Sequence, residues 1–160
     1  MKTVFKSSMV AHIWANQSQR EARNGGNTFY FTGDTIYSYG SHFPIARHVS
    51  RNGRRAILFT TRSYSVSTSR HISHTRRAIS QADTVFNVPD PTASNPRDVF
   101  NAYRERVEHL KRGYGRARSR KPDILGYMER LINEANDYAE FFGLRSRLKM
   151  PENIECSEAI

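Results

Sequence analysis

Short runs of hydrophobic and β-branched residues, separated by turn-forming residues, fill the first 62 positions of the chain. Residues 28–32 and 35–39 form one pair around Gly33-Asp34, and residues 45–50 and 56–61 form a second pair around Asn52-Gly53. Asn-Gly is typical of a two-residue hairpin turn, because both residues tolerate a positive φ. The pattern predicts four strands in an antiparallel meander. An apolar segment before them, residues 10–15, is either a buried helical turn or a further strand.

Beyond residue 66 the apolar positions recur at helical spacing. Residues 69–82 predict a first helix, which follows several serine and threonine residues that can cap it. Asn95 and Pro96 predict the start of a second helix, which we expect to end at Gly113. A third helix is predicted from residue 122 to residue 143.

These elements indicate an α+β fold, in which a small, mostly antiparallel sheet from the N-terminal half packs against about three helices from the C-terminal half. With 160 residues the chain is long enough for one domain with a substantial core. We place that domain at residues 1–150, rich in strands over 1–66 and helical over 67–150. Residues 88–94 are typical of a linker, and residues 151–160 of a mobile acidic tail.

Composition excludes several classes of protein. The chain has no run of the roughly 18 apolar residues that a membrane-spanning helix needs. Its N-terminus lacks the apolar core of a secretory signal peptide. The single cysteine, Cys156, cannot form an internal disulfide, which is compatible with a reducing compartment. We therefore expect a cytoplasmic protein without a membrane partner, and the sequence does not indicate its oligomeric state.

The net charge of +10 is concentrated in one stretch of the chain. Residues 35–82 contain eight arginines and four histidines but no aspartate or glutamate, and they carry +8. Residues 1–34 carry +2, and residues 83–160 carry no net charge. A dense field of guanidinium groups without acidic neighbours favours phosphate or carboxylate groups of another molecule. We expect that molecule to be nucleic acid, either DNA or RNA.

The candidate nucleic-acid-binding residues fall into three groups. The first group flanks the Asn52-Gly53 turn, the second precedes and begins the first predicted helix, and the third lies in a basic loop predicted at residues 113–121. Aromatic residues of the sheet, among them Tyr37, Tyr39 and Phe43, could stack on bases beside them. The full set is Arg47, Arg51, Arg54 and Arg55; Arg62, Tyr64, Arg70, His71, His74, Arg76 and Arg77; and Arg116, Arg118 and Arg120.

Catalysis is an alternative role for the histidines of the acid-free stretch, which are His42, His48, His71 and His74. Two imidazoles could serve as acid and base in metal-independent phosphodiester cleavage, assisted by Arg70 and Tyr64. No carboxylate lies near them in sequence to orient a ring, so we favour a binding protein over an enzyme. His71 and His74 lack the further ligands of a zinc site, and we expect neither a metal nor a cofactor.

Three segments of the chain carry a resemblance. They are MVAHIWANQ at 9–17, YSYGSHFPIA at 37–46 and TRSYSVSTSRH at 61–71. Through these segments, residues 8–82 resemble a small uncharacterised domain of bacteriophage and mobile-element proteins. The resemblance implies a phage-like origin without an established activity. It favours a protein that binds host or phage nucleic acid, or that blocks a host nucleoprotein or defence complex. An inhibitor that binds an acidic protein surface remains a further alternative.

Overall fold

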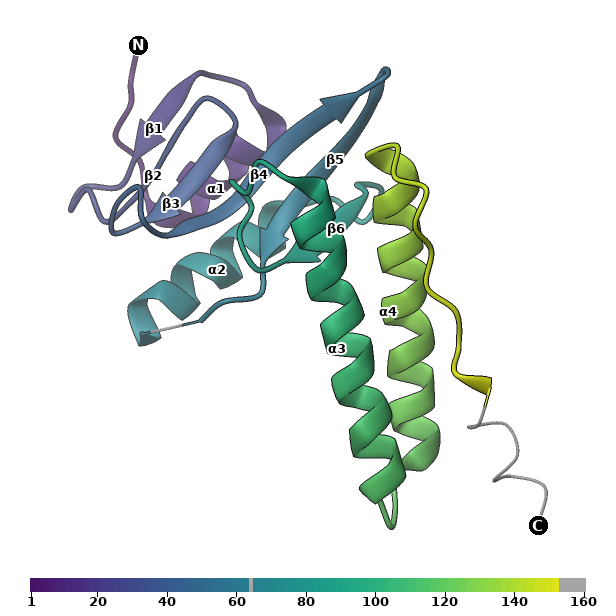
Figure 1. Ribbon diagram of the computed structural model, residues 1–160. Coiled ribbons are helices and arrows are strands. Elements are labelled where there is room, and N and C mark those ends of the chain that lie inside the picture. The colour runs from purple at the N-terminus through teal and green to yellow at the C-terminus, as the bar shows by residue number, and fades with distance from the viewer. Residues whose placement is uncertain (64, 153–160) are drawn as a thin grey trace. The chain divides into compact units, whose positions relative to one another are not determined.

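The computed structural model describes residues 1–63 and 65–152 and shows the α+β fold that the sequence predicts (Figure 1). The chain divides into two compact units, Met1–Ala93 and Ser94–Ile160. The first unit contains the sheet and two helices, and the second contains the last two helices. Tyr64 and residues 153–160 of the predicted tail lie outside the described residues.

The first unit is built on a six-stranded sheet with the strands in sequence order. Neighbouring strands are antiparallel, except that β5 and β6 are parallel. The predicted meander forms β2 to β5, and a short strand that was not predicted extends it at each edge. The strands are β1 (Glu21–Arg23), β2 (Phe29–Thr32), β3 (Thr35–Ser38), β4 (Pro44–Arg51), β5 (Arg54–Thr60) and β6 (Val85–Val88).

The turn between β4 and β5 forms at the predicted Asn-Gly pair. Asn52 has a φ of 51° and Gly53 a φ of 77°. Two successive positive φ values are those of a type I′ turn, whose twist matches that of the flanking strands. The turn places Arg51 directly opposite Arg54. Local turn chemistry therefore sets the register of the arginines at this end of the sheet.

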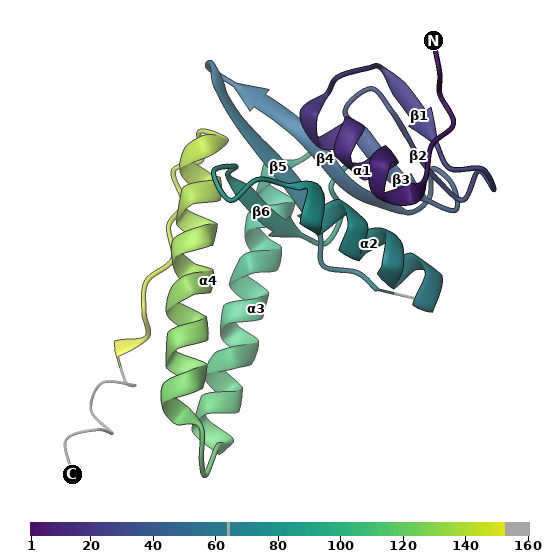
Figure 2. The same cartoon turned by 180° about the vertical axis from the view of Figure 1, so that it is seen from behind.

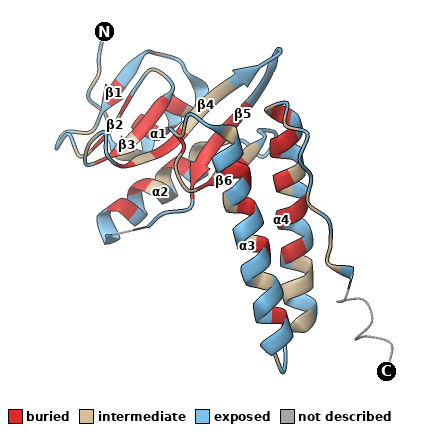
Figure 3. Cartoon of the chain, in the orientation of Figure 1, coloured by how far each residue is buried: buried red, intermediate tan, exposed pale blue. Residues whose placement is uncertain are grey.

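Helices α1 (Ser7–Asn16) and α2 (Val66–Ala78) lie against one face of the sheet and contact each other (Figure 2). The ambiguous segment at residues 10–15 is therefore helical. α2 connects the parallel strands β5 and β6, and it begins at Val66 because the Ser65 hydroxyl caps the Thr68 amide at 3.1 Å. Apolar side chains from the helices and the sheet, including Trp14 and Phe59, form a buried core (Figure 3).

The second unit consists of α3 (Pro96–Arg116) and α4 (Lys121–Phe141), which pack against each other. α3 begins as predicted, with the Asn95 side chain accepting a hydrogen bond from the Arg97 amide at 3.0 Å. The Tyr103 hydroxyl donates to Glu134 Oε2 at 2.6 Å and links the two helices. None of the described helices is both long and apolar enough to cross a membrane.

The prediction that α3 ends at Gly113 is wrong. The helix continues through Gly113 and Gly115 to Arg116. Tyr114 between the two glycines is buried, and the Lys121 ammonium lies 4.9 Å from its ring centroid. Burial of this aromatic side chain offsets the roughly 1 kcal/mol by which each helical glycine disfavours the helix. Only residues 117–120 of the predicted basic loop therefore lie between the helices.

Candidate nucleic-acid interface

Arg51, Arg54 and Arg55 surround the β4–β5 turn and are exposed; we call them the hairpin arginines. Arg51 and Arg54 are direct cross-strand partners. Their guanidinium groups emerge on the same face of the hairpin, so a phosphate bound beside them would be attracted by both. Because side chains alternate along a strand, Arg55 emerges on the other face from Arg54. The hairpin tip therefore offers cationic groups to an anion on both faces.

Arg47 lies on the same strand but has a different environment. Its side chain is half-buried, and its Nε donates a hydrogen bond to the Pro91 carbonyl at 2.7 Å. Since Pro91 follows β6, this bond ties the end of the sheet unit to the centre of β4. Arg47 thus has a structural role that its sequence position did not indicate.

A second basic locus, the α2 surface, consists of Arg70, His74 and Arg77. These residues line an open groove of about 260 Å³ on the helix, together with Val66 and two serines. The hairpin tip projects away from α2 in both views of the molecule, so the hairpin arginines and the α2 surface are separate loci (Figures 1 and 2).

Of the other predicted binding residues near α2, Arg62 and Arg76 have different surroundings. Arg62 is exposed immediately after β5. The Arg76 guanidinium lies 4.0 Å from the centroid of the Phe59 ring, a cation–π contact that packs its side chain onto the sheet core. Tyr64 lies outside the described residues. Arg62 thus adds an exposed cation between β5 and α2. Arg76 mainly holds α2 against the sheet through its contact with Phe59.

His71 lies on the buried side of α2, with 7% of its surface exposed. Its ring stacks on Phe29 with the planes 7° apart, and its Nδ1 lies 2.7 Å from the Ser38 hydroxyl. Burial, with a smaller effect of the neighbouring His74, lowers the pKa of His71, so the ring is neutral at neutral pH. His71 therefore supports the α2 surface from beneath and offers little of its own side chain to a ligand.

A third locus, which we call the basic turn, consists of Arg116 at the end of α3 and Arg118 and Arg120 in the connection to α4. All three side chains are exposed. Arg120 has a φ of 65° and occupies the N-cap of α4 without a side-chain capping bond. A cation at a helix N-terminus and a left-handed non-glycine residue are both unfavourable. A bound anion near Arg120 would offset the first of these costs.

His48 borders a cleft of about 110 Å³ beside the C-terminal end of α1. Its Nε2 donates to the Trp14 carbonyl at 3.0 Å, and burial lowers the pKa of His48 despite this bond. Arg55 and Asp83 line the same cleft. The sequence pattern did not indicate this carboxylate. Asp83 is distant from His48 in the chain, and it reaches the cleft only because β5 pairs in parallel with β6.

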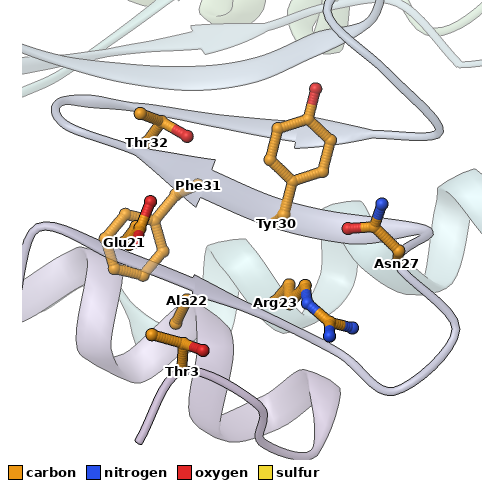
Figure 4. A pocket seen from close by; sticks show the side chains of 8 residues that line it. All are labelled: Thr3, Glu21, Ala22, Arg23, Asn27, Tyr30, Phe31 and Thr32. Atoms are coloured by element: carbon orange, nitrogen blue, oxygen red, sulfur yellow. The ribbon is translucent and has the colours of Figure 1, made fainter. Parts of the chain in front are cut away.

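On the sheet face away from α1 and α2, Arg23, Tyr30 and Tyr37 lie side by side on β1, β2 and β3. The two tyrosine rings are 5.3 Å apart between centroids and inclined by 27°, and both are half-buried. Next to them is a pocket of about 230 Å³, which Glu21 and Thr32 also line (Figure 4). Of these residues the sequence pattern indicated only Tyr37 as a candidate. Glu21 and Arg23 were missed because β1 and its register were not predicted.

Comparisons of the chain with models of protein families, with curated proteins and with solved structures find no match. The predicted relationship to phage and mobile-element domains therefore stays a prediction. Within residues 1–63 and 65–152, no three His, Cys, Asp or Glu side chains are grouped closely enough to hold a metal ion.

Proposed function

We propose that this protein binds nucleic acid, with the hairpin arginines as the main phosphate contacts. The observation that carries the proposal is the cross-strand pair Arg51 and Arg54, exposed at the tip of a type I′ hairpin within a stretch that has no carboxylate. Guanidinium groups hold phosphate with paired, charge-assisted hydrogen bonds. The α2 surface supplies additional phosphate contacts on the same unit, and the basic turn is a separate candidate on the second unit.

Nucleic acid fits this surface better than an acidic protein does for two reasons. First, the cations of the sheet unit occupy two separate loci, the hairpin arginines and the α2 surface, which suits a ligand with a regular succession of phosphates more than a single acidic patch. Second, half-exposed aromatic rings are present on the same unit, and Tyr30 and Tyr37 offer stacking surface that a carboxylate does not use.

The test is the binding of fluorescently labelled single-stranded and duplex oligonucleotides at low salt, followed by anisotropy. The triple variant Arg51→Gln, Arg54→Gln and Arg55→Gln should lose at least about tenfold in affinity, because each phosphate contact contributes on the order of 1 kcal/mol or more. The matched control changes three exposed arginines outside the loci, Arg20→Gln, Arg97→Gln and Arg145→Gln. It removes the same net charge and should lose much less.

A failure to bind either oligonucleotide at low salt would contradict the proposal. In that case a host protein with an acidic surface, or a nucleoprotein complex, becomes the expected partner. A pull-down that survives nuclease treatment and is lost in the hairpin variant would identify such a partner. A phage origin would place either interaction in the cytoplasm of the host.

Metal-independent phosphodiester cleavage is the second candidate function, favoured by the cleft that His48 shares with Arg55 and Asp83. A neutral imidazole beside a guanidinium and a carboxylate has the groups for proton transfer and for stabilising a charged transition state. Labelled RNA should then be degraded in the presence of EDTA, and His48→Ala should abolish the degradation. Intact RNA after long incubation with excess protein excludes this function.

A further inference from the structure

We propose that the pocket on β1 and β2 is a site for one unpaired nucleobase that carries an exocyclic amino group, such as cytosine. We call it the base pocket; its lining residues include Thr3, Glu21, Arg23, Asn27, Tyr30 and Thr32 (Figure 4). The inference rests on the proposed function and deepens it, because it names single-stranded nucleic acid as the ligand.

The stacking surface of the base pocket comes from Tyr30. Its ring lies on the sheet face away from the helices and is supported by Tyr37, 5.3 Å away between centroids. Within the described part of the chain, neither tyrosine hydroxyl has a protein hydrogen-bond partner. Burial and the neighbouring Tyr37 raise the pKa of Tyr30, so its hydroxyl stays protonated and can donate. A half-exposed, buttressed ring of this kind binds bases by stacking.

The polar groups of the base pocket come from β1, where Glu21 and Arg23 flank the buried Ala22. Because alternate residues share a face, both side chains lie beside Tyr30 and Thr32, their cross-strand partners. A glutamate oxygen accepts a hydrogen bond from the amino group of cytosine, whereas thymine presents a carbonyl oxygen there. Arg23 can donate to the ring nitrogen or carbonyl of the same base, or to its phosphate.

The walls of the base pocket are held in place by backbone hydrogen bonds. The Arg23 amide donates to the Thr3 carbonyl at 2.8 Å, which fixes the N-terminal segment along β1. On the other side, the Asn24 Oδ1 accepts from the amides of Thr28 and Phe29 at 2.9 and 3.1 Å. These bonds order the turn that carries Asn27. A pocket shaped before the ligand arrives loses less entropy on binding.

The size of the base pocket agrees with a ligand of one ring system. Its volume of about 230 Å³ is below the roughly 300–1,000 Å³ of sites for drug-sized molecules. A base that enters it must leave its own stack, which costs least for a strand that is already single. Duplex nucleic acid therefore contacts the basic loci without filling this pocket.

The experiment compares full-length protein binding to labelled oligodeoxycytidine and oligothymidine of equal length, with a duplex of the same length alongside. The wild type should bind oligodeoxycytidine more tightly than oligothymidine. Tyr30→Leu should weaken oligodeoxycytidine binding by about fivefold to a hundredfold, the range for loss of one stacked base. Tyr30→Phe, which keeps the stacking ring and loses only the hydroxyl, should retain most of it, and neither variant should change duplex binding. Glu21→Gln, at an exposed position, should reduce the preference for cytosine.

The outcomes distinguish failure of the base-pocket proposal from failure of the proposed role of the hairpin arginines. If Tyr30→Leu binds like the wild type, or if both oligonucleotides bind equally, the base pocket is overturned while the proposed function stands. If the hairpin variant binds normally but Tyr30→Leu and Glu21→Gln have the stated effects, the base pocket stands and the hairpin assignment fails. If the wild type binds no oligonucleotide at low salt, both fail.

Discussion

At the residue scale, the histidines are divided by their surroundings rather than by their position in the sequence. His71 of α2 stacks on Phe29 of the sheet, and His48 donates a hydrogen bond to the Trp14 carbonyl in α1. Burial lowers the pKa of both imidazoles. Sequence proximity to arginines suggested a role in phosphate binding for His71, but which side of a helix is buried depends on tertiary packing that the local pattern does not contain.

These two imidazoles should make the folded state sensitive to acid. In the unfolded chain a histidine has a pKa near 6.5, and in the folded protein the pKa values of His48 and His71 are lower. The unfolded chain then takes up protons first as the pH falls, so stability is full above about pH 6.5 and declines below it. Urea unfolding across this range measures the effect. The double variant His48→Gln and His71→Asn should flatten the decline, whereas His109→Gln, at an exposed site, should not.

The Ser38 hydroxyl is a buried partner of both His71 and Thr68, at 2.7 and 3.3 Å. Ser38→Ala removes the hydroxyl beside the His71 Nδ1, whereas the Thr68 hydroxyl keeps its hydrogen bond with Ser65 at 3.1 Å. We expect a loss of about 1–3 kcal/mol in the free energy of unfolding, measured by urea denaturation. Ser73→Ala changes an exposed serine of α2 and serves as the control. Equal stability of the two variants would show that the Ser38 bond contributes little.

At the element scale, the sequence predicted those features whose cause is local. The β4–β5 hairpin follows from Asn52 and Gly53, and the start of α3 follows from Asn95. β1 and β6 were missed because strands of three or four residues are defined by pairing with distant neighbours rather than by their own pattern. The base pocket and the cleft beside His48 depend on these two edge strands, so neither could be predicted.

Gly53 and Gly113 should respond to alanine in opposite directions. Gly53 has a φ of 77°, where a Cβ is strained, so Gly53→Ala should destabilise the protein by about 1–2 kcal/mol and weaken oligonucleotide binding. Gly113 is helical, and a Cβ there meets nothing within 4 Å, so Gly113→Ala should stabilise by about 0.5–1 kcal/mol. Thermal and urea unfolding measure both. A lower free energy of unfolding for Gly113→Ala would contradict the prediction for this position.

The link between α3 and α4 gives a further prediction. The Tyr103 hydroxyl is buried against Glu134, and burial, with the carboxylate beside it, raises the pKa of Tyr103. Tyr103→Phe should lower the free energy of unfolding by about 1.5–3 kcal/mol, the usual contribution of a hydrogen bond to a charged group. Tyr127→Phe is the matched control, because the Tyr127 hydroxyl also links the two helices, accepting from Arg106 at 3.3 Å, but at an exposed position where the bond contributes less. Similar effects of the two changes would contradict a stabilising role for the Tyr103 bond.

At the scale of the whole molecule, charge is segregated along the chain. The sheet unit contains all of the acid-free stretch, whereas residues 83–160 have no net charge. The sequence alone indicated this asymmetry, and the structure assigns different roles to its members. The hairpin arginines are exposed, Arg47 holds a carbonyl, and Arg76 packs on a ring. Phosphate binding is assigned to the hairpin arginines, because their guanidinium groups are exposed and lie together at the β4–β5 turn.

The most direct test of that claim is the salt dependence of oligonucleotide binding by the wild type and by the Arg51→Gln, Arg54→Gln, Arg55→Gln variant. Each phosphate contact contributes about 0.7–0.9 to the slope of the logarithm of affinity against the logarithm of salt concentration. We expect a steep slope for the wild type and a slope shallower by about 2–3 for the variant. Binding that is insensitive to salt, or an unchanged slope in the variant, would contradict it.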